Sequence, residues 1–404
     1  MRRRHLLGLG ATSALGAFGT QLWAAPAAPA RLLVVFLRGG YDALNLLVPA
    51  RSGYYNEMRP TIAVPVGSAA KPGQPAATLL NADWALHPAL EASVVPLVRA
   101  GQASFIPFAG TDDLSRSHFE TQDSIELGQP VGGRRDFQSG FMNRLAATLG
   151  AGEAQAIAFT DQLPLTLRGK VDVANISLRN APAAPGTDRL APAISAMYRH
   201  TALQARVEEA FKVRDEVARE MARDMSGEME GSGRGAINAK GFEGEARRIA
   251  RVMRERYALG FVDIGGWDTH VAEGGATGYL ASRLEELGRG LAAFADGLGA
   301  DQWKRTVVVV ISEFGRTVRE NGGRGTDHGH GSVYWVLSGG LRAQPVTGEQ
   351  AAVDAASLFQ NRDLPVLNDY RAVLGGLMAR QFGLSASALD TVFPGVKPRD
   401  LGLV

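Results

Sequence analysis

Residues 306–311 read TVVVVI and are followed by SEFGRT, residues 312–317. Four consecutive valines between a threonine and an isoleucine are typical of a strand buried on both faces, because β-branched side chains pack well on a pleated surface. Two charged residues, Glu313 and Arg316, follow the run directly. The stretch therefore predicts a central parallel strand that ends in a polar loop, which is where open α/β sheets place functional groups.

Other apolar runs predict further strands of the same sheet. They occupy residues 31–37, 103–108, 156–160, 258–264 and 333–337. Helical patterns lie between several of these runs, and residues 279–298, for example, carry apolar side chains at every third or fourth position. Strands that alternate with helices in this way predict a three-layer α/β/α sandwich with a mainly parallel central sheet.

One segment differs in composition from the rest of the chain. Residues 201–257 are rich in Glu, Arg, Ala and Met and contain a Gly-Ser-Gly break at residues 231–233. This pattern predicts two amphipathic helices joined by a flexible turn. We expect them to be a helical insertion in a single domain that spans residues 31–404.

The first thirty residues have the plan of an export signal. Residues 1–30 begin with basic side chains, continue through an apolar, glycine-rich middle and end in alanine and proline. Arg3 and Arg4, followed after one spacer by two leucines, fit the twin-arginine pattern. We therefore expect the twin-arginine translocase as a partner and a periplasmic or extracellular mature protein. A membrane anchor retained at the N-terminus is the alternative. No other run of the sequence approaches the ~20 apolar residues of a spanning helix.

Charge and cysteine content exclude several classes of function. The chain has 43 Lys and Arg residues against 41 Asp and Glu residues, a formal net charge of +2, so nothing indicates nucleic acid as a partner. It has no cysteine, which excludes disulfides, thiol nucleophiles and cysteine-bound metals. Any metal must therefore be held by oxygen and imidazole nitrogen.

Polar side chains stand at the ends of most of the predicted strands. They are Asp42; Ser115, Ser117 and His118; Asp268 and His270; Glu313 and Arg316; and, before the last strand, Asp327, His328 and His330. Because the carboxyl ends of parallel strands share one edge of a sheet, we expect these groups to converge. Several carboxylates at one point repel one another unless a cation neutralises them. The set thus predicts a centre for divalent metal, with zinc, manganese, magnesium and calcium as candidates.

Each of these residues, taken singly, also has a plain structural explanation. Asp42 and Ser115 suit helix caps, and Asp268 with His270 suits a hydrogen-bonded turn. Glu313 is also placed to form an ion pair with Arg316. The metal hypothesis therefore depends on the combination and not on any one position.

The chain resembles a known family through a series of motifs. They are FLRGGYDALN, YYNEMRPTIAVP, LHPAL, SRSHFETQD, GGWDTH, SEFGRTVRENGGRGTDHGHG and DLPVLNDYRAVL. Together, over about residues 31–394, they resemble the bacterial family known as domain of unknown function 1501. That family resembles the alkaline phosphatase and sulfatase superfamily. The resemblance implies an alkaline phosphatase-like fold around a two-metal hydrolytic centre that acts on a small phosphate or sulfate ester.

The superfamily pattern implies metal ligands in this chain. Asp42 matches an aspartate that follows the first strand, and Asp268 with His270 matches a later Asp and His placed a few residues apart. A final histidine of the pattern corresponds to His328 or His330.

The resemblance also implies catalytic residues. Ser115 and Ser117 stand where the superfamily has its nucleophile, and Ser117-His118-Phe119 is similar to the run that follows the nucleophile in the mutases. In that interpretation one serine attacks the ester, and Arg316 clamps the tetrahedral oxyanion with its planar fork of donors.

The chain departs from the superfamily after its strongest strand. Glu313-Phe314 stands where an Asp-His pair is usual, so a ligand must come from elsewhere, and Asp327 or the second histidine of TDHGHG is a candidate. Two other functions therefore stay open. One is a non-catalytic metal-binding envelope protein with a degenerate site, and the other is a different kind of metal hydrolase.

Overall fold

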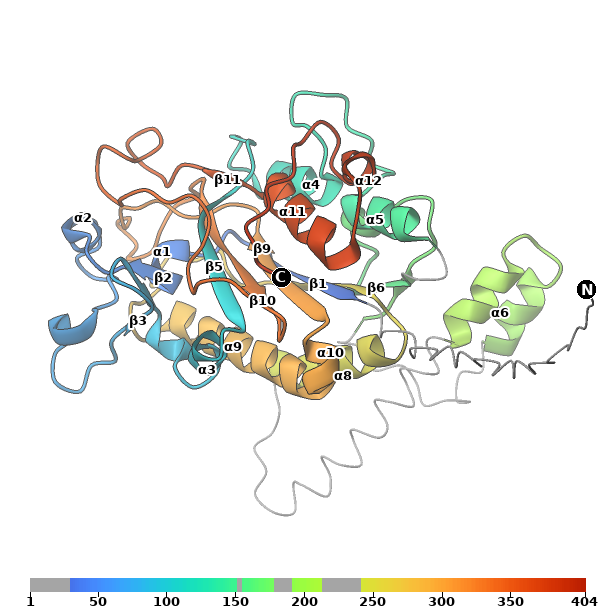
Figure 1. Ribbon diagram of the computed structural model, residues 1–404, viewed down its shortest axis with the longest axis horizontal. Helices are drawn as coiled ribbons and strands as arrows, with labels where there is room; N and C mark the ends of the chain where they lie inside the picture. The colour runs from blue at the N-terminus through green and yellow to red at the C-terminus, as the bar shows by residue number, and fades with distance from the viewer. Residues whose placement is uncertain (1–29, 151–154, 178–190, 213–240) are drawn as a thin grey trace, which may run out of the picture.

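The computed structural model describes residues 30–150, 155–177, 191–212 and 241–404. Within these residues an eight-stranded sheet runs through the molecule (Figure 1). From one edge to the other its strands are β11 (Asn368–Asp369), β5 (Ala103–Gly110), β10 (Ser332–Leu337), β9 (Thr306–Ser312), β1 (Arg31–Leu37), β8 (Leu259–Ile264), β6 (Ala156–Phe159) and β7 (Ala174–Asn175).

All neighbouring strands of this sheet are parallel except at β10, which is antiparallel to both β5 and β9. Residues 313–331 connect β9 to β10 without a helix, whereas a parallel return would need a crossover. The start of β10 therefore lies at the same edge as the carboxyl ends of β5, β9, β1 and β8. The predicted mainly parallel sheet is confirmed, and so are the six strands expected from the apolar runs.

Helices cover both faces of the sheet (Figure 1). One face carries α3 (Val94–Arg99), α8 (Phe242–Glu255), α9 (Tyr279–Leu298) and α10 (Ala300–Trp303), and the other carries α4 (His118–Leu127), α5 (Phe141–Leu149), α11 (Tyr370–Phe382) and α12 (Ala386–Val392). Because successive side chains of a strand point to opposite faces, Leu33 and Val35 belong to the first core, and Leu32 and Val34 belong to the second.

Smaller elements complete the described chain. A second, antiparallel sheet has the order β2 (Leu47–Pro49), β4 (Trp84–Leu86) and β3 (Thr78–Leu79), and it adjoins α1 (Ala43–Leu46) and α2 (Gly53–Met58). Short 3-10 turns occupy Gly67–Ala69, Pro88–Leu90 and Leu165–Leu167, and α6 covers Ala191–Tyr198. Among the described residues, no helix combines the length and the apolar character needed to cross a bilayer.

The segment expected to be a helical insertion is described only in part. Its C-terminal portion forms α8, and Phe242, Ile249 and Met253 bury this helix beneath the sheet beside α9. Residues 213–240 lie outside the described residues, as does all but the last residue of the expected export signal.

Candidate metal centre

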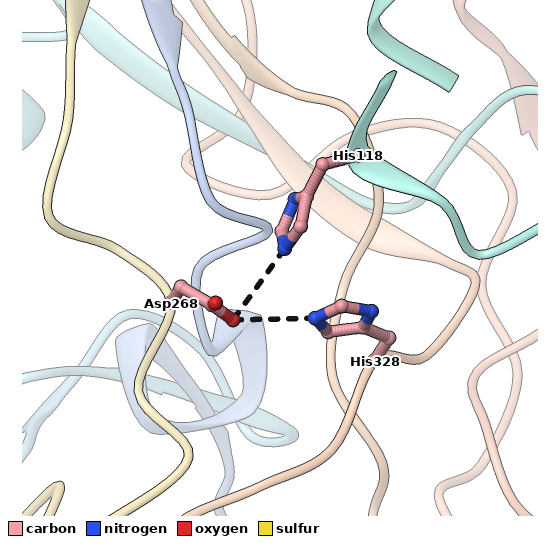
Figure 2. A group of neighbouring side chains, drawn as sticks. All are labelled: His118, Asp268 and His328. Atoms are coloured by element: carbon pink, nitrogen blue, oxygen red, sulfur yellow. Dashed lines mark hydrogen bonds and ion pairs between the residues drawn. The ribbon is translucent and has the colours of Figure 1, made fainter. Parts of the chain in front are cut away.

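Three side chains from three separate segments of the chain meet at the carboxyl edge of the sheet. His118 begins α4, Asp268 follows β8 and His328 precedes β10. One ligand atom from each lies within 4.8 Å of the other two. Figure 2 shows both imidazoles directed at the same carboxylate oxygen, with Asp268 Oδ1 lying 3.5 Å from His118 Nε2 and 3.2 Å from His328 Nε2.

The far nitrogen of each of these two histidines is held by an acceptor. His118 Nδ1 lies 2.8 Å from Oε1 of Glu313, and His328 Nδ1 lies 3.0 Å from the carbonyl oxygen of Arg116. Since neither acceptor has a proton to give, each Nδ1 carries a hydrogen, and in its neutral form each ring keeps a lone pair on Nε2. In the described part of the chain, His118 Nε2 is a buried atom without a hydrogen-bond partner. An unpartnered lone pair aimed at a carboxylate fits a cation between them.

A third histidine stands beside this group. His270 Nε2 lies 2.9 Å from Asp268 Oδ1 and 3.1 Å from His328 Nε2, and its Nδ1 lies 3.4 Å from Oδ1 of Asp327. Ligand atoms around a tetrahedral zinc with bonds of 2.0–2.1 Å are separated by roughly 3.3 Å. The distances of His270 Nε2 from Asp268 Oδ1 and from His328 Nε2 are close to this separation.

Arg316 keeps Asp268 ionised and fixes the surrounding backbone. Partial burial raises the pKa of Asp268, but its hydrogen bond and attraction to Arg316 outweigh this effect and hold the pKa below its ordinary value. The other N–H groups of the buried guanidinium donate to the carbonyls of Gly39, Gly40 and Thr326. Arg316 is thus occupied in joining three loops, whereas the sequence predicted a clamp for the substrate.

Glu313 lies behind His118 and not among the atoms that converge. Its Oε1 accepts from His118 Nδ1, from Gln122 Nε2 and from the backbone N–H of Gly39, each at 2.8 Å, and its Oε2 accepts from Ser312 Oγ at 2.9 Å. Burial raises the pKa of Glu313, yet these hydrogen bonds bring it below the ordinary value. The hydrogen bond between Glu313 and His118 raises the pKa of His118, whereas burial lowers the pKa of His328.

Two of the predicted ligands are placed in other surroundings. Asp42 caps α1 and forms a buried ion pair with Arg59, whose two terminal nitrogens bond its two carboxylate oxygens. His330 is buried with its ring against Phe359, and burial lowers its pKa to about 4. Asp327 does reach the site, through His270 Nδ1.

The two candidate nucleophiles are occupied at the start of α4. Ser117 is the N-cap of this helix and accepts from the backbone N–H of Glu120. Ser115 Oγ pairs with Thr121 Oγ1 at 3.2 Å. Within the described residues, neither hydroxyl hydrogen-bonds His118, Asp268 or His328, so both serines act here as local supports of the loop that carries His118.

Glu273 was missed by the sequence predictions. Its fully buried Oε2 accepts from Thr269 Oγ1 and Thr326 Oγ1, both at 2.9 Å, so it joins the loop of Asp268 to the loop of His328. Burial, followed by the nearby charge of Asp42, raises the pKa of Glu273 well above its ordinary value. It belongs to VAEGG, a glycine-rich stretch with no recognisable motif, so no local pattern indicated its role.

The structure therefore defines an α/β protein with a histidine–aspartate cluster at the carboxyl edge of its parallel strands. The chain belongs to the family described as protein of unknown function (DUF1501), whose model matches residues 29–393, and the membership of this family predicted from the motifs is confirmed. A comparison of the sequence with curated proteins found no match. One similar solved structure is the crystal structure of Ps i-CgsB in complex with k-i-k-neocarrahexaose, at 10% identity over 93% of this chain and 75% of that chain. Its TM-score of 0.37 is too low to establish a common fold.

Proposed function

We propose that the protein is an exported, metal-dependent hydrolase of a small phosphate or sulfate ester, built on an alkaline phosphatase-like α/β/α fold. One observation carries the proposal: the Nε2 atoms of His118, His270 and His328 all approach Oδ1 of Asp268, at 3.5, 2.9 and 3.2 Å. Among these groups His118, Asp268 and His328, whose ligand atoms lie within 4.8 Å of one another, supply two imidazoles and one carboxylate, a set that suits zinc or manganese better than magnesium or calcium and leaves one tetrahedral position open. When bound, such an ion supplies a Lewis acid that polarises the ester and lowers the pKa of a coordinated water.

The residues around the ligands support this use. Glu313, the Arg116 carbonyl and Asp327 each face the Nδ1 atom of one histidine, which orients the ring and directs Nε2 inward. Arg316 keeps Asp268 in its charged form. Because Ser115 and Ser117 are engaged at the start of α4, we assign the attack on the ester to water and not to a serine.

A second candidate is a non-catalytic metal-binding envelope protein. The observation in its favour is that the nucleophile and the arginine clamp implied by the superfamily pattern are engaged elsewhere. Ser117 caps α4, and Arg316 is buried among backbone carbonyls. A protein of this kind would bind metal without hydrolysing an ester. Turnover of an ester by the metal-loaded protein therefore distinguishes the two candidates.

The test combines metal content with turnover. The chelator-treated protein is titrated with Zn²⁺ and Mn²⁺ by calorimetry, and the loaded protein is assayed on nitrophenyl phosphate and nitrophenyl sulfate. We expect binding and hydrolysis in the unsubstituted protein, loss of both in Asp268→Asn, and retention of both in Asp354→Asn, an exposed carboxylate outside the cluster. Binding without hydrolysis favours the envelope protein, and absence of binding overturns both candidates.

A further inference from the structure

A hollow of about 260 Å³ opens on the surface beside the histidine–aspartate cluster. Its lining includes Tyr54, Arg319, Asn321, Asp327, Asn361 and Arg362. At roughly 30 Å³ for each water of the liquid, this volume holds about nine waters, or one small organic group. The hollow is thus large enough for part of a ligand and too small for a macromolecule.

Residues that line the hollow contact residues of the cluster directly. Asp327 forms part of its wall, and the Oδ1 of this residue lies 3.4 Å from His270 Nδ1. Asn321 Nδ2 donates both to that oxygen, at 3.1 Å, and to the His270 carbonyl, at 3.0 Å. Arg362 Nη2 donates to the His328 carbonyl at 2.9 Å. A ligand in the hollow therefore lies against the loops that carry two of the histidines.

The carboxylates of the hollow are already engaged. Glu320 accepts from the hydroxyl and the backbone N–H of Thr61 and from the backbone N–H of Ile62. Asp327 accepts from Asn321 and faces His270. These contacts occupy Oε1 and Oε2 of Glu320 and Oδ1 of Asp327, and both groups keep their negative charge.

The two arginines of the hollow have fewer hydrogen-bond partners than its carboxylates. In the described part of the chain, the exposed guanidinium of Arg319 has no hydrogen bond or ion pair. Arg362 is 41% exposed, and beyond the His328 carbonyl its contact is Asp363 Oδ1 at 3.6 Å. The hollow thus presents two guanidinium groups with open N–H donors, and such groups bind carboxylate, phosphate and sulfate groups through paired N–H donors.

We infer that the hollow binds an anionic group of the substrate that is distinct from the ester at the cluster. The substrate class is then an ester that carries a second anionic group, such as a carboxylate, on the same small molecule. Arg319 and Arg362 hold this second group, and Tyr54 and Leu358 line the space beside it. The inference rests on the proposed function for the reaction, but binding of the second anion does not require turnover.

The test uses two phosphonates that cannot be hydrolysed, phenylphosphonate and 4-carboxyphenylphosphonate, with the zinc-loaded protein in a calorimeter. We expect the carboxylated ligand to bind about tenfold more tightly, the order of one charge-assisted hydrogen bond. Arg319→Gln removes this preference and leaves phenylphosphonate binding unchanged. The matched control is Arg324→Gln, an exposed arginine of the same loop that does not line the hollow, and it keeps the preference. Inorganic sulfate is a further probe in this experiment. If the hollow were a site for free anions, sulfate would bind equally tightly with and without phenylphosphonate.

The inference is overturned by equal affinity for the two phosphonates, or by an equal loss of the preference in Arg319→Gln and Arg324→Gln. It is also overturned if sulfate binds tightly whether or not phenylphosphonate is present. Failure of the proposed function is seen separately, as absent turnover of nitrophenyl esters by a protein that still prefers the carboxylated phosphonate.

Discussion

Oε1 of Glu313 lies 2.8 Å from Nδ1 of His118, although 195 residues separate the two in the sequence. The carboxylate follows the most apolar strand of the sheet, and the imidazole begins a helix on one face of it. A carboxylate behind a histidine fixes the ring and makes its other nitrogen a better electron-pair donor. This contact gives Glu313 a supporting role at the site.

Glu313→Gln should therefore weaken zinc binding by about 10–100-fold, the usual cost of losing such a partner. The amide preserves the size of the side chain and removes its charge. Calorimetric titration measures the affinity, and Glu349→Gln, an exposed carboxylate paired with Arg399, is the control. Unchanged affinity in Glu313→Gln would contradict the supporting role.

Asp42→Asn should leave the zinc stoichiometry unchanged and destabilise the fold. Breaking a buried ion pair by changing one partner costs about 3–5 kcal/mol, because Arg59 is left charged and buried. Urea unfolding measures the loss, and metal content is determined below the unfolding transition. If the variant folds but holds no zinc, Asp42 is a ligand after all.

The double variant Ser115→Ala, Ser117→Ala should retain zinc binding and most of the hydrolytic activity. We expect a loss of stability of about 1 kcal/mol, since the N-cap of α4 is removed. The ratio kcat/KM on nitrophenyl phosphate decides the outcome. A fall of a thousandfold or more, with zinc still bound, would show that a serine is the nucleophile.

Glu273 should make stability depend on pH above the pKa of an ordinary glutamate. Its pKa is raised in the folded protein, so its contribution is fully present below the unfolded value of about 4.3 and is lost as pH rises through the folded value. The pKa of Asp42 is lowered by Arg59, so its own contribution changes only at acid pH. The free energy of unfolding should therefore begin to fall as pH rises above about 4.3 and should level off once Glu273 has ionised in the folded protein.

Glu273→Gln tests this assignment, because an amide imitates a carboxyl that keeps its proton. In this variant the decline with pH should be reduced, while Glu273→Ala should lose about 1–3 kcal/mol at every pH by leaving the hydroxyls of Thr269 and Thr326 without their acceptor. Urea unfolding at several pH values provides the comparison. The same slope in Glu273→Gln as in the unsubstituted protein would refute the raised pKa.

Much of the sheet was predictable because its signal is local. The valine run of β9 and the helical period of α9 each lie within one short stretch, and their bounds agree closely with the expected ones. The sequence also indicated the edge of the sheet at which His118, Asp268 and His328 meet. These residues lie next to strand ends, and the carboxyl ends of parallel strands share one edge of a sheet.

Only the tertiary structure decided which polar residues share the cluster. Asp42, next to a strand end like the others, is held by Arg59, and Glu313 turns to His118. Ser117 satisfies the start of its own helix. A carboxylate or hydroxyl bonds whichever donor the fold brings nearest, and that choice depends on contacts between distant segments. Residue types and their spacing alone therefore determined the place of the site, and folding determined its members.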